Sequence, residues 1–221
     1  MKTFQELQEG VYDPNIFKAI FLAGGPGSGK SYVVRKTTGG LGMKIVNSDD
    51  IYEKMLNDAG LETTPEDIFS DKGQEIRVKA KKTTKRMQGN FLKGRLGVII
   101  DGTGKDYDKI AKQASELQKL GYETYMIFVN TSLDTAQERN RMRQRTLPEA
   151  EVEKMWNAVQ RNIGKFQQFF GSRNMIIVDN NDAGEDVFNK VWKRIMMLAK
   201  TKVTNHIAKS WIAQQLAAKK R

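Results

Sequence analysis

The chain contains no cysteine and a single histidine, His206. Without cysteine it can form no disulfide, no thiolate metal site and no cysteine nucleophile. One histidine speaks against a multi-histidine metal centre and against a Ser-His-Asp hydrolase. No apolar run approaches the ~18 residues that cross a bilayer. The N-terminal segment is polar and carries Glu6 and Glu9, unlike a secretory signal, so we expect a cytoplasmic protein with no membrane partner.

Acidic residues are absent from the segment between Val187 and Arg221. That segment carries nine Lys/Arg and supplies most of the net charge of +11. A second acid-free run, Arg77 to Arg95, holds eight Lys/Arg. Basic patches attract polyanions or phosphorylated molecules, although a solvated helix face is the ordinary explanation of a lysine-rich run. Because the C-terminal segment concentrates the imbalance, we expect it to bind nucleic acid or an acidic partner.

Apolar runs alternate with helical patterns along the 221 residues, a length that suits one domain with an appendage. Such continuous apolar strands are typical of a parallel sheet covered by helices on both faces. The sequence therefore predicts an α/β domain over residues 1–200 and a basic amphipathic helix over 201–221. One long helix is expected from Pro148 to Phe170. The five predicted strands are Ile16–Ala23, Met43–Val46, Leu96–Ile100, Tyr125–Val129 and Met175–Val178.

The segment GGPGSGKS at 24–31 has the spacing of a phosphate-binding loop, G-x-x-x-x-G-K-[ST], between a strand and a helix. Backbone N–H groups freed by the glycines, together with the helix N-terminus, attract phosphate. The alternative, a glycine-rich turn with a chance lysine, does not account for the flanking strand and helix. We expect Lys30 to reach the β- and γ-phosphates and the Ser31 hydroxyl to ligate Mg²⁺. The predicted nucleotide-binding residues of this segment are Gly25, Gly27, Ser28, Gly29, Lys30, Ser31 and Tyr32.

Aspartates follow two of the predicted strands, where ligands of parallel sheets bind. Asp101 has the position of a Walker-B acid and is expected to hold Mg²⁺ through water or to contact substrate. Asp49 and Asp50 follow the second strand, and a carboxylate there can accept the proton of an attacking hydroxyl. The pair could also cap the next helix, with one Asp capping while the other acts. We predict that Asp49 is the base.

A cluster of arginines, Arg139, Arg141, Arg143 and Arg145, precedes the Leu147-Pro148 break. Positive charge on a connection between helices can close over the γ-phosphate and neutralise charge during transfer. The arginines could also be no more than an exposed helix face. Their density favours a lid, for which we expect Arg139, Arg141 or Arg143 to act.

The order of these motifs resembles the zeta-toxin-like P-loop kinases and, more loosely, the polynucleotide 5′-kinases of bacteriophages. The resemblance rests on GGPGSGKS at 24–31, VNSDD at 46–50 and VIIDGTGKDYDKIAKQASELQKLGYETY at 98–125. It implies the P-loop NTPase fold, ATP with Mg²⁺ as donor, Asp49 as base and lid arginines within 139–145. It also implies a position of Asn180 near the adenine and, if a phage encodes the chain, a place in the host cytoplasm. The implied acceptor contacts are Asp101, Thr103 and Lys105, and we expect Asp50 to bind the acceptor as well.

Taken together, these patterns predict an ATP-dependent kinase that phosphorylates a hydroxyl. The basic segments favour, as one alternative, a kinase of polynucleotide 5′-hydroxyl ends. Its binding of nucleic acid would depend strongly on salt and would weaken on truncation after Lys200. A second alternative is an ATPase or accessory protein, regulated by DNA or a partner, without kinase activity.

Overall fold

The computed structural model describes residues 10–142 and 146–219. Its centre is a five-stranded parallel sheet with the strand order β2-β3-β1-β4-β5. The predicted α/β architecture is confirmed, and each predicted strand is present. The strands are β1 (Lys18–Ala23), β2 (Lys44–Val46), β3 (Val98–Ile100), β4 (Glu123–Asn130) and β5 (Met175–Asp179).

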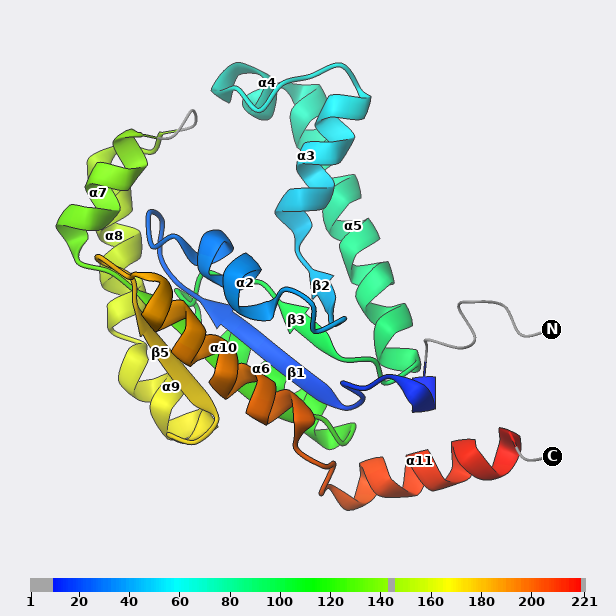
Figure 1. The fold of residues 1–221 in the computed structure, drawn as a ribbon. Coiled ribbons are helices and arrows are strands. Elements are labelled where there is room, and N and C mark those ends of the chain that lie inside the picture. The colour runs from blue at the N-terminus through cyan, green and yellow to red at the C-terminus, as the bar shows by residue number, and fades with distance from the viewer. Residues whose placement is uncertain (1–9, 143–145, 220–221) are drawn as a thin grey trace.

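Helices lie on both faces of the sheet and beyond its carboxyl ends (Figure 1). None of the helices in the described ranges combines the length and apolarity needed to span a bilayer. After a 3₁₀ turn, η1 (Gly10–Tyr12), the helices are α2 (Lys30–Thr38), α3 (Ser48–Asp58), α4 (Pro65–Phe69), α5 (Asp71–Lys93), α6 (Tyr107–Lys119), α7 (Leu133–Arg141), α8 (Glu149–Gln160), α9 (Ile163–Phe170), α10 (Glu185–Lys200) and α11 (His206–Lys219).

The central strand β1 is buried along its whole length, because both faces of the sheet carry helices. Ala19 and Phe21 point to one face, where α6, α9 and α11 pack. Ile20 and Leu22 point to the other face, which α2 and α10 cover. Each large apolar side chain buried in this way contributes about 1.5–3 kcal/mol. The two cores fix the carboxyl end of β1, from which the phosphate-binding loop leaves.

A third, smaller core joins α3, α4 and α5 into an arm at the β2 edge of the sheet (Figure 1). Tyr52 and Leu56 of α3 pack there against Ile76 of α5. The short helix α4 is capped by Thr64, whose side chain accepts a hydrogen bond from the Asp67 N–H. The arm places α5 alongside the end of β3.

The prediction of one helix from Pro148 to Phe170 is wrong. α8 ends at Gln160, and α9 begins at Ile163. Between them lies Asn162, whose buried side-chain amide donates to the carbonyl oxygens of Gly104 and Lys105, each at 3.0 Å. The apolar residues keep their helical spacing across the break, so the sequence pattern gives no sign of it. The hydrogen bonds from Asn162 to a distant loop are what mark the break.

The C-terminal helix α11 is docked on the protein. Ala208 is fully buried, close to Gly121, which has a positive φ of 98°. Trp211 meets the ring of Phe17 edge to face at 5.5 Å between centroids. The ammonium of Lys219 stands 4.5 Å from the centre of the Tyr12 ring. Apolar packing and cation–π contacts therefore hold this basic helix in one place.

Candidate active site

The loop between β1 and α2 has the shape that binds phosphate. Gly27 and Gly29 both have φ of 74°, in the left-handed region that favours glycine. A Cβ on Gly27 would lie 2.2 Å from the Ala136 carbonyl oxygen, so this position admits only glycine without movement of α7. No side chain in the described part of the chain caps the start of α2 at Lys30, which leaves its first N–H groups for an anion.

Lys30 of this loop forms an ion pair with Asp101, at the end of the neighbouring strand β3. Both side chains are largely buried. The Asp101 N–H donates to the Val46 carbonyl of β2 at 3.1 Å, and the Gly24 N–H donates to the Thr103 carbonyl at 3.0 Å. The sheet thus brings the predicted phosphate lysine and the predicted Walker-B acid together.

Two residues far along the chain close the loop from the other side. The Asn180 amide, after β5, donates to the Ser28 carbonyl at 2.7 Å. The Arg139 guanidinium donates through Nη2 to the Asn181 carbonyl at 2.8 Å, while its Nη1 is buried with no partner among the described residues. A Cβ on Gly29 would lie 3.6 Å from that Nη1. Arg139 therefore holds an unused donor beside the phosphate loop.

The other predicted lid and loop residues lie elsewhere. Arg141 forms an ion pair with Glu149 on the surface at 2.8 Å, and Arg143 and Arg145 lie outside the described residues. The exposed Tyr32 ring meets Phe188 of α10 edge to face at 5.5 Å. Of the predicted arginines that the structure describes, Arg139 is the one at the loop.

Asp49 and Asp50 occupy the first turn of α3, but neither caps it. Asn47 does so, by accepting from the Asp49 N–H at 2.8 Å. The Asp50 carboxylate accepts from the Asn47 side-chain amide at 2.9 Å, whereas the Asp49 carboxylate has no such bond within the described part of the chain. Desolvation raises the pKa of Asp50, and the nearby charges of Asp101, Asp49 and Glu53 raise it further.

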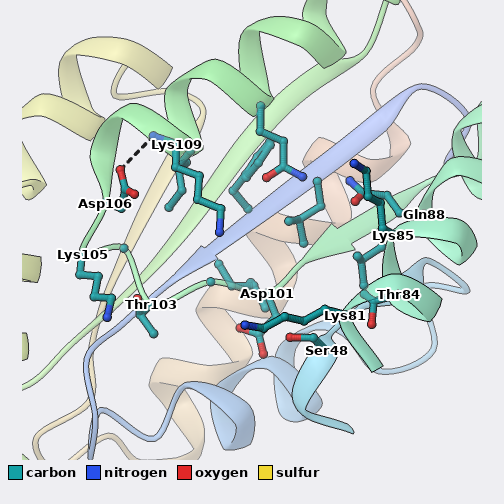
Figure 2. Close-up of a pocket in the computed structure, with 18 residues that line it drawn as sticks. Ser48, Lys81, Thr84, Lys85, Gln88, Asp101, Thr103, Lys105, Asp106 and Lys109 are labelled. Carbon is teal, nitrogen blue, oxygen red and sulfur yellow. Dashed lines mark hydrogen bonds between the residues drawn. The ribbon is translucent and has the colours of Figure 1, made fainter. Parts of the chain in front are cut away.

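A cavity of about 350 Å³ opens beside Asp101, between the loop after β3 and the helices α5 and α6 (Figure 2). Thr103 and Lys105 line it, as the resemblance implies. The sequence reasoning missed its other polar side chains as site residues, although the basic run of α5 was a signal. They are Ser48, Lys81, Thr84, Lys85, Gln88, Asp106, Lys109 and Gln113.

These residues fit a nucleoside triphosphate. Three features of the described residues suit bound phosphates: the left-handed backbone at Gly27 and Gly29, the start of α2 without a side-chain cap, and the Arg139 Nη1 donor without a partner. For Mg²⁺ the candidate ligands are the Ser31 hydroxyl and the Asp101 carboxylate. No group of three or more acidic or histidine side chains within the described ranges could hold a metal ion by itself. Magnesium in phosphate-transfer sites commonly takes only one or two protein ligands and the substrate phosphates.

Comparison with protein families finds a match between residues 20–162 and the family described as "AAA domain". The matched segment contains the phosphate loop, Asp49, Asp101 and Arg139. Comparison with curated protein sequences finds no match.

Among solved structures, a gluconokinase from Sinorhizobium meliloti 1021 matches 84% of this chain and 95% of its own, with 16% identity and a TM-score of 0.52. A shikimate kinase from Acinetobacter baumannii in complex with shikimate matches 88% of this chain and 99% of its own, with 16% identity and a TM-score of 0.51. The Pnkp1/Rnl/Hen1 RNA repair complex matches 69% of this chain and 47% of its own, with 22% identity and a TM-score of 0.51. These likenesses show a P-loop kinase-like fold.

Proposed function

Because the chain belongs to the AAA-domain family, and its fold is that of P-loop kinases, we propose that it is an ATP-dependent phosphotransferase. It moves the γ-phosphate of ATP to a hydroxyl of an unidentified acceptor. The observation that carries this proposal is the ion pair between Lys30 of the phosphate-binding loop and Asp101, which lines the cavity. In this proposal the phosphates of ATP lie on the Lys30 side of the pair and the acceptor lies on the Asp101 side.

In the proposed reaction the acceptor oxygen attacks the γ-phosphorus. A new P–O bond forms, the bond to the β–γ bridging oxygen breaks, and ADP leaves. Asp49 takes the hydroxyl proton, because no side chain among the residues that the structure describes holds its carboxylate, whereas Asn47 holds that of Asp50. The Nη1 of Arg139, which has no hydrogen-bond partner within residues 10–142 and 146–219, stabilises charge on the transferred group.

The remaining residues bind and orient. Gly25 to Ser31, with Asn180 behind them, would hold the triphosphate. Asp101, Thr103 and Lys105, which line the cavity, would contact the acceptor, and so would Asp50 of α3. Mg²⁺ on Ser31 and Asp101 would neutralise phosphate charge when bound. We assign no contact with phosphate to Arg141, which is paired with Glu149. The position of Asn180 beneath Ser28 supports a role in shaping the loop.

Within this function we propose a zeta-toxin-like type, on the segments 24–31, 46–50 and 98–125. Residues 1–200 would form the kinase-like domain and 201–221 an appended basic helix. We also propose that the protein is located in the cytoplasm, because it would use ATP as the phosphoryl donor. The lysines of the cavity favour a second candidate, a kinase of polynucleotide 5′-hydroxyl ends.

A screen with γ-labelled ATP tests the proposal, with nucleotide sugars, nucleosides and 5′-hydroxyl oligonucleotides as acceptors. We expect labelled product with one class. Asp49→Asn should remove transfer and leave ATP binding intact, whereas Asp58→Asn, at the far end of the same helix, should leave both unchanged. Full turnover by Asp49→Asn would refute the base. Hydrolysis without any acceptor, stimulated by DNA, would instead identify an ATPase.

A further inference from the structure

The cavity beside Asp101 continues along the helices that line it. A second cavity, of about 620 Å³, lies along the same two helices, α5 and α6. The two cavities share Lys85 and Gln88 of α5 and Lys109 and Gln113 of α6. They therefore form one groove, which runs from Asp101 to the far ends of both helices. We call it the α5–α6 groove.

Lysines line both walls of the α5–α6 groove. Lys81 and Lys85 come from α5, Lys109 and Lys112 from α6, and Lys105 from the loop after β3. None of the five forms an ion pair with a residue in the described ranges. Figure 2 shows Lys85 and Lys109 on facing helices, both directed at the cavity.

The acids of the groove do not balance these charges. Asp101 is already paired with Lys30, and Asp106 accepts from the Lys109 backbone N–H as the N-cap of α6. Glu116 is the one acidic residue among the described residues that line the second cavity. A solvated helix face would account for lysines on α5 by themselves. It does not account for facing lysines on two helices, since like charges across a cleft repel unless an anion lies between them.

We propose that the α5–α6 groove binds phosphate groups of the acceptor. The acceptor is thus a phosphate-bearing molecule whose hydroxyl reaches Asp101 while its phosphates lie between Lys85 and Lys109. This inference rests on the proposed phosphotransferase function and names its substrate class. The length of the groove suits a phosphodiester chain, and the same chemistry also exists in a small phosphorylated molecule.

The lining also indicates how such a ligand is recognised. The amides of Gln88 and Gln113 can hydrogen-bond phosphate oxygens, and none of the described residues that line the second cavity is aromatic. Without aromatic rings, bases cannot stack there. Binding should therefore depend on salt and be insensitive to base identity.

The test compares two double variants that remove equal charge from the same helices. Lys85→Gln/Lys109→Gln alters the groove. Lys82→Gln/Lys119→Gln alters lysines of α5 and α6 that do not line it. Fluorescence anisotropy with a 3′-labelled, 5′-hydroxyl oligothymidylate should show about tenfold weaker binding for the groove variant, and a salt slope smaller by about 1.4. The salt slope of the control variant should differ from that of the wild type by less than the loss of one phosphate contact would produce. Equal loss in both variants would overturn the proposal.

Competition by a nucleoside 3′-phosphate separates the two sources of phosphate. Much weaker competition than by unlabelled oligonucleotide identifies a chain, and equal competition identifies a small molecule. Either result supports phosphate binding by the α5–α6 groove, provided that the Lys85→Gln/Lys109→Gln variant weakens binding of the ligand that competes. Phosphoryl transfer to the acceptor is measured in a separate assay. Groove-dependent binding with no phosphorylation of any acceptor contradicts the phosphotransferase alone. Transfer to an uncharged acceptor, with a KM that the groove variant leaves unchanged, contradicts the groove alone.

Discussion

The Lys30 ammonium and the Asp101 carboxylate form an ion pair across the carboxyl ends of β1 and β3. A triphosphate in the loop would compete with Asp101 for Lys30, because both are anions within reach of one ammonium group. Separating this pair therefore offsets part of the free energy gained when Lys30 binds phosphate. The pair also links the nucleotide side of the site to the α5–α6 groove.

Asp101→Asn should separate binding from transfer. Measured without Mg²⁺, ATP affinity should rise severalfold, because Lys30 loses its competing partner. Phosphoryl transfer with Mg²⁺ should fall by about 100-fold or more, since a group that acts on the reacting centre is lost. Isothermal titration calorimetry and the γ-label assay give the two values. A weaker affinity without Mg²⁺ would show that the pair does not restrain Lys30.

Gly27→Ala should disrupt the phosphate loop. The new Cβ would meet the Ala136 carbonyl at 2.2 Å in a backbone of positive φ, so we expect a loss of about 2 kcal/mol in stability. ATP binding should be lost as the loop shifts. Gly164→Ala in α9 is the matched control. A Cβ there meets nothing within 4 Å, and stability should change by about +0.5 to +1 kcal/mol. Urea unfolding of both variants measures the difference.

Asp50→Asn should stabilise the protein at neutral pH. The pKa of Asp50 is raised in the folded state, so ionisation disfavours folding as pH rises through that pKa. Removal of the charge should increase the Tm by about 1–2 °C at pH 7. The gain should shrink as pH falls through the raised pKa of Asp50 toward the ordinary aspartate value of 3.8, because the wild-type carboxyl takes up its own proton over that range. Calorimetric scans across this range measure it, and a pH-independent difference would contradict the electrostatic cause.

Glu123→Gln should destabilise the protein at neutral pH and reduce its sensitivity to acid. Burial raises the pKa of Glu123, but hydrogen bonds from Lys18, the Thr204 N–H and Tyr125 outweigh it, and the pKa is lowered overall. Because its pKa is lowered, the ionised Glu123 stabilises the fold at pH values above the unfolded-state pKa of 4.5. This stabilisation is lost as the pH falls through the folded-state pKa. The variant leaves the buried Lys18 unpaired, which should cost about 3 kcal/mol.

Unfolding of wild type and Glu123→Gln at pH 7 and below pH 4 tests this. The difference between the two proteins should narrow in acid. Glu153→Gln, an exposed change on α8, is the control and should match wild type at both pH values. An undiminished difference in acid would assign the loss to packing, not to charge.

The strands and the phosphate loop could be predicted from the sequence because their signals are local. β1 and the loop after it are specified by an apolar run followed by glycines at fixed spacing. The Thr64 cap was equally local. The break at Asn162 could not be predicted, since its cause is a pair of hydrogen bonds to residues more than fifty positions away.

The sequence by itself determined that this chain builds a parallel α/β sheet with a phosphate-binding loop, because apolar periods and glycine spacing act within a few residues. Tertiary structure alone decided which polar groups share the site. α5 leads into β3 and α6 leaves it, so that Lys85 and Lys109 face each other only once β3 has its place in the sheet. Likewise, the packing of α7 on the loop selects Arg139 and leaves Arg141 at the surface.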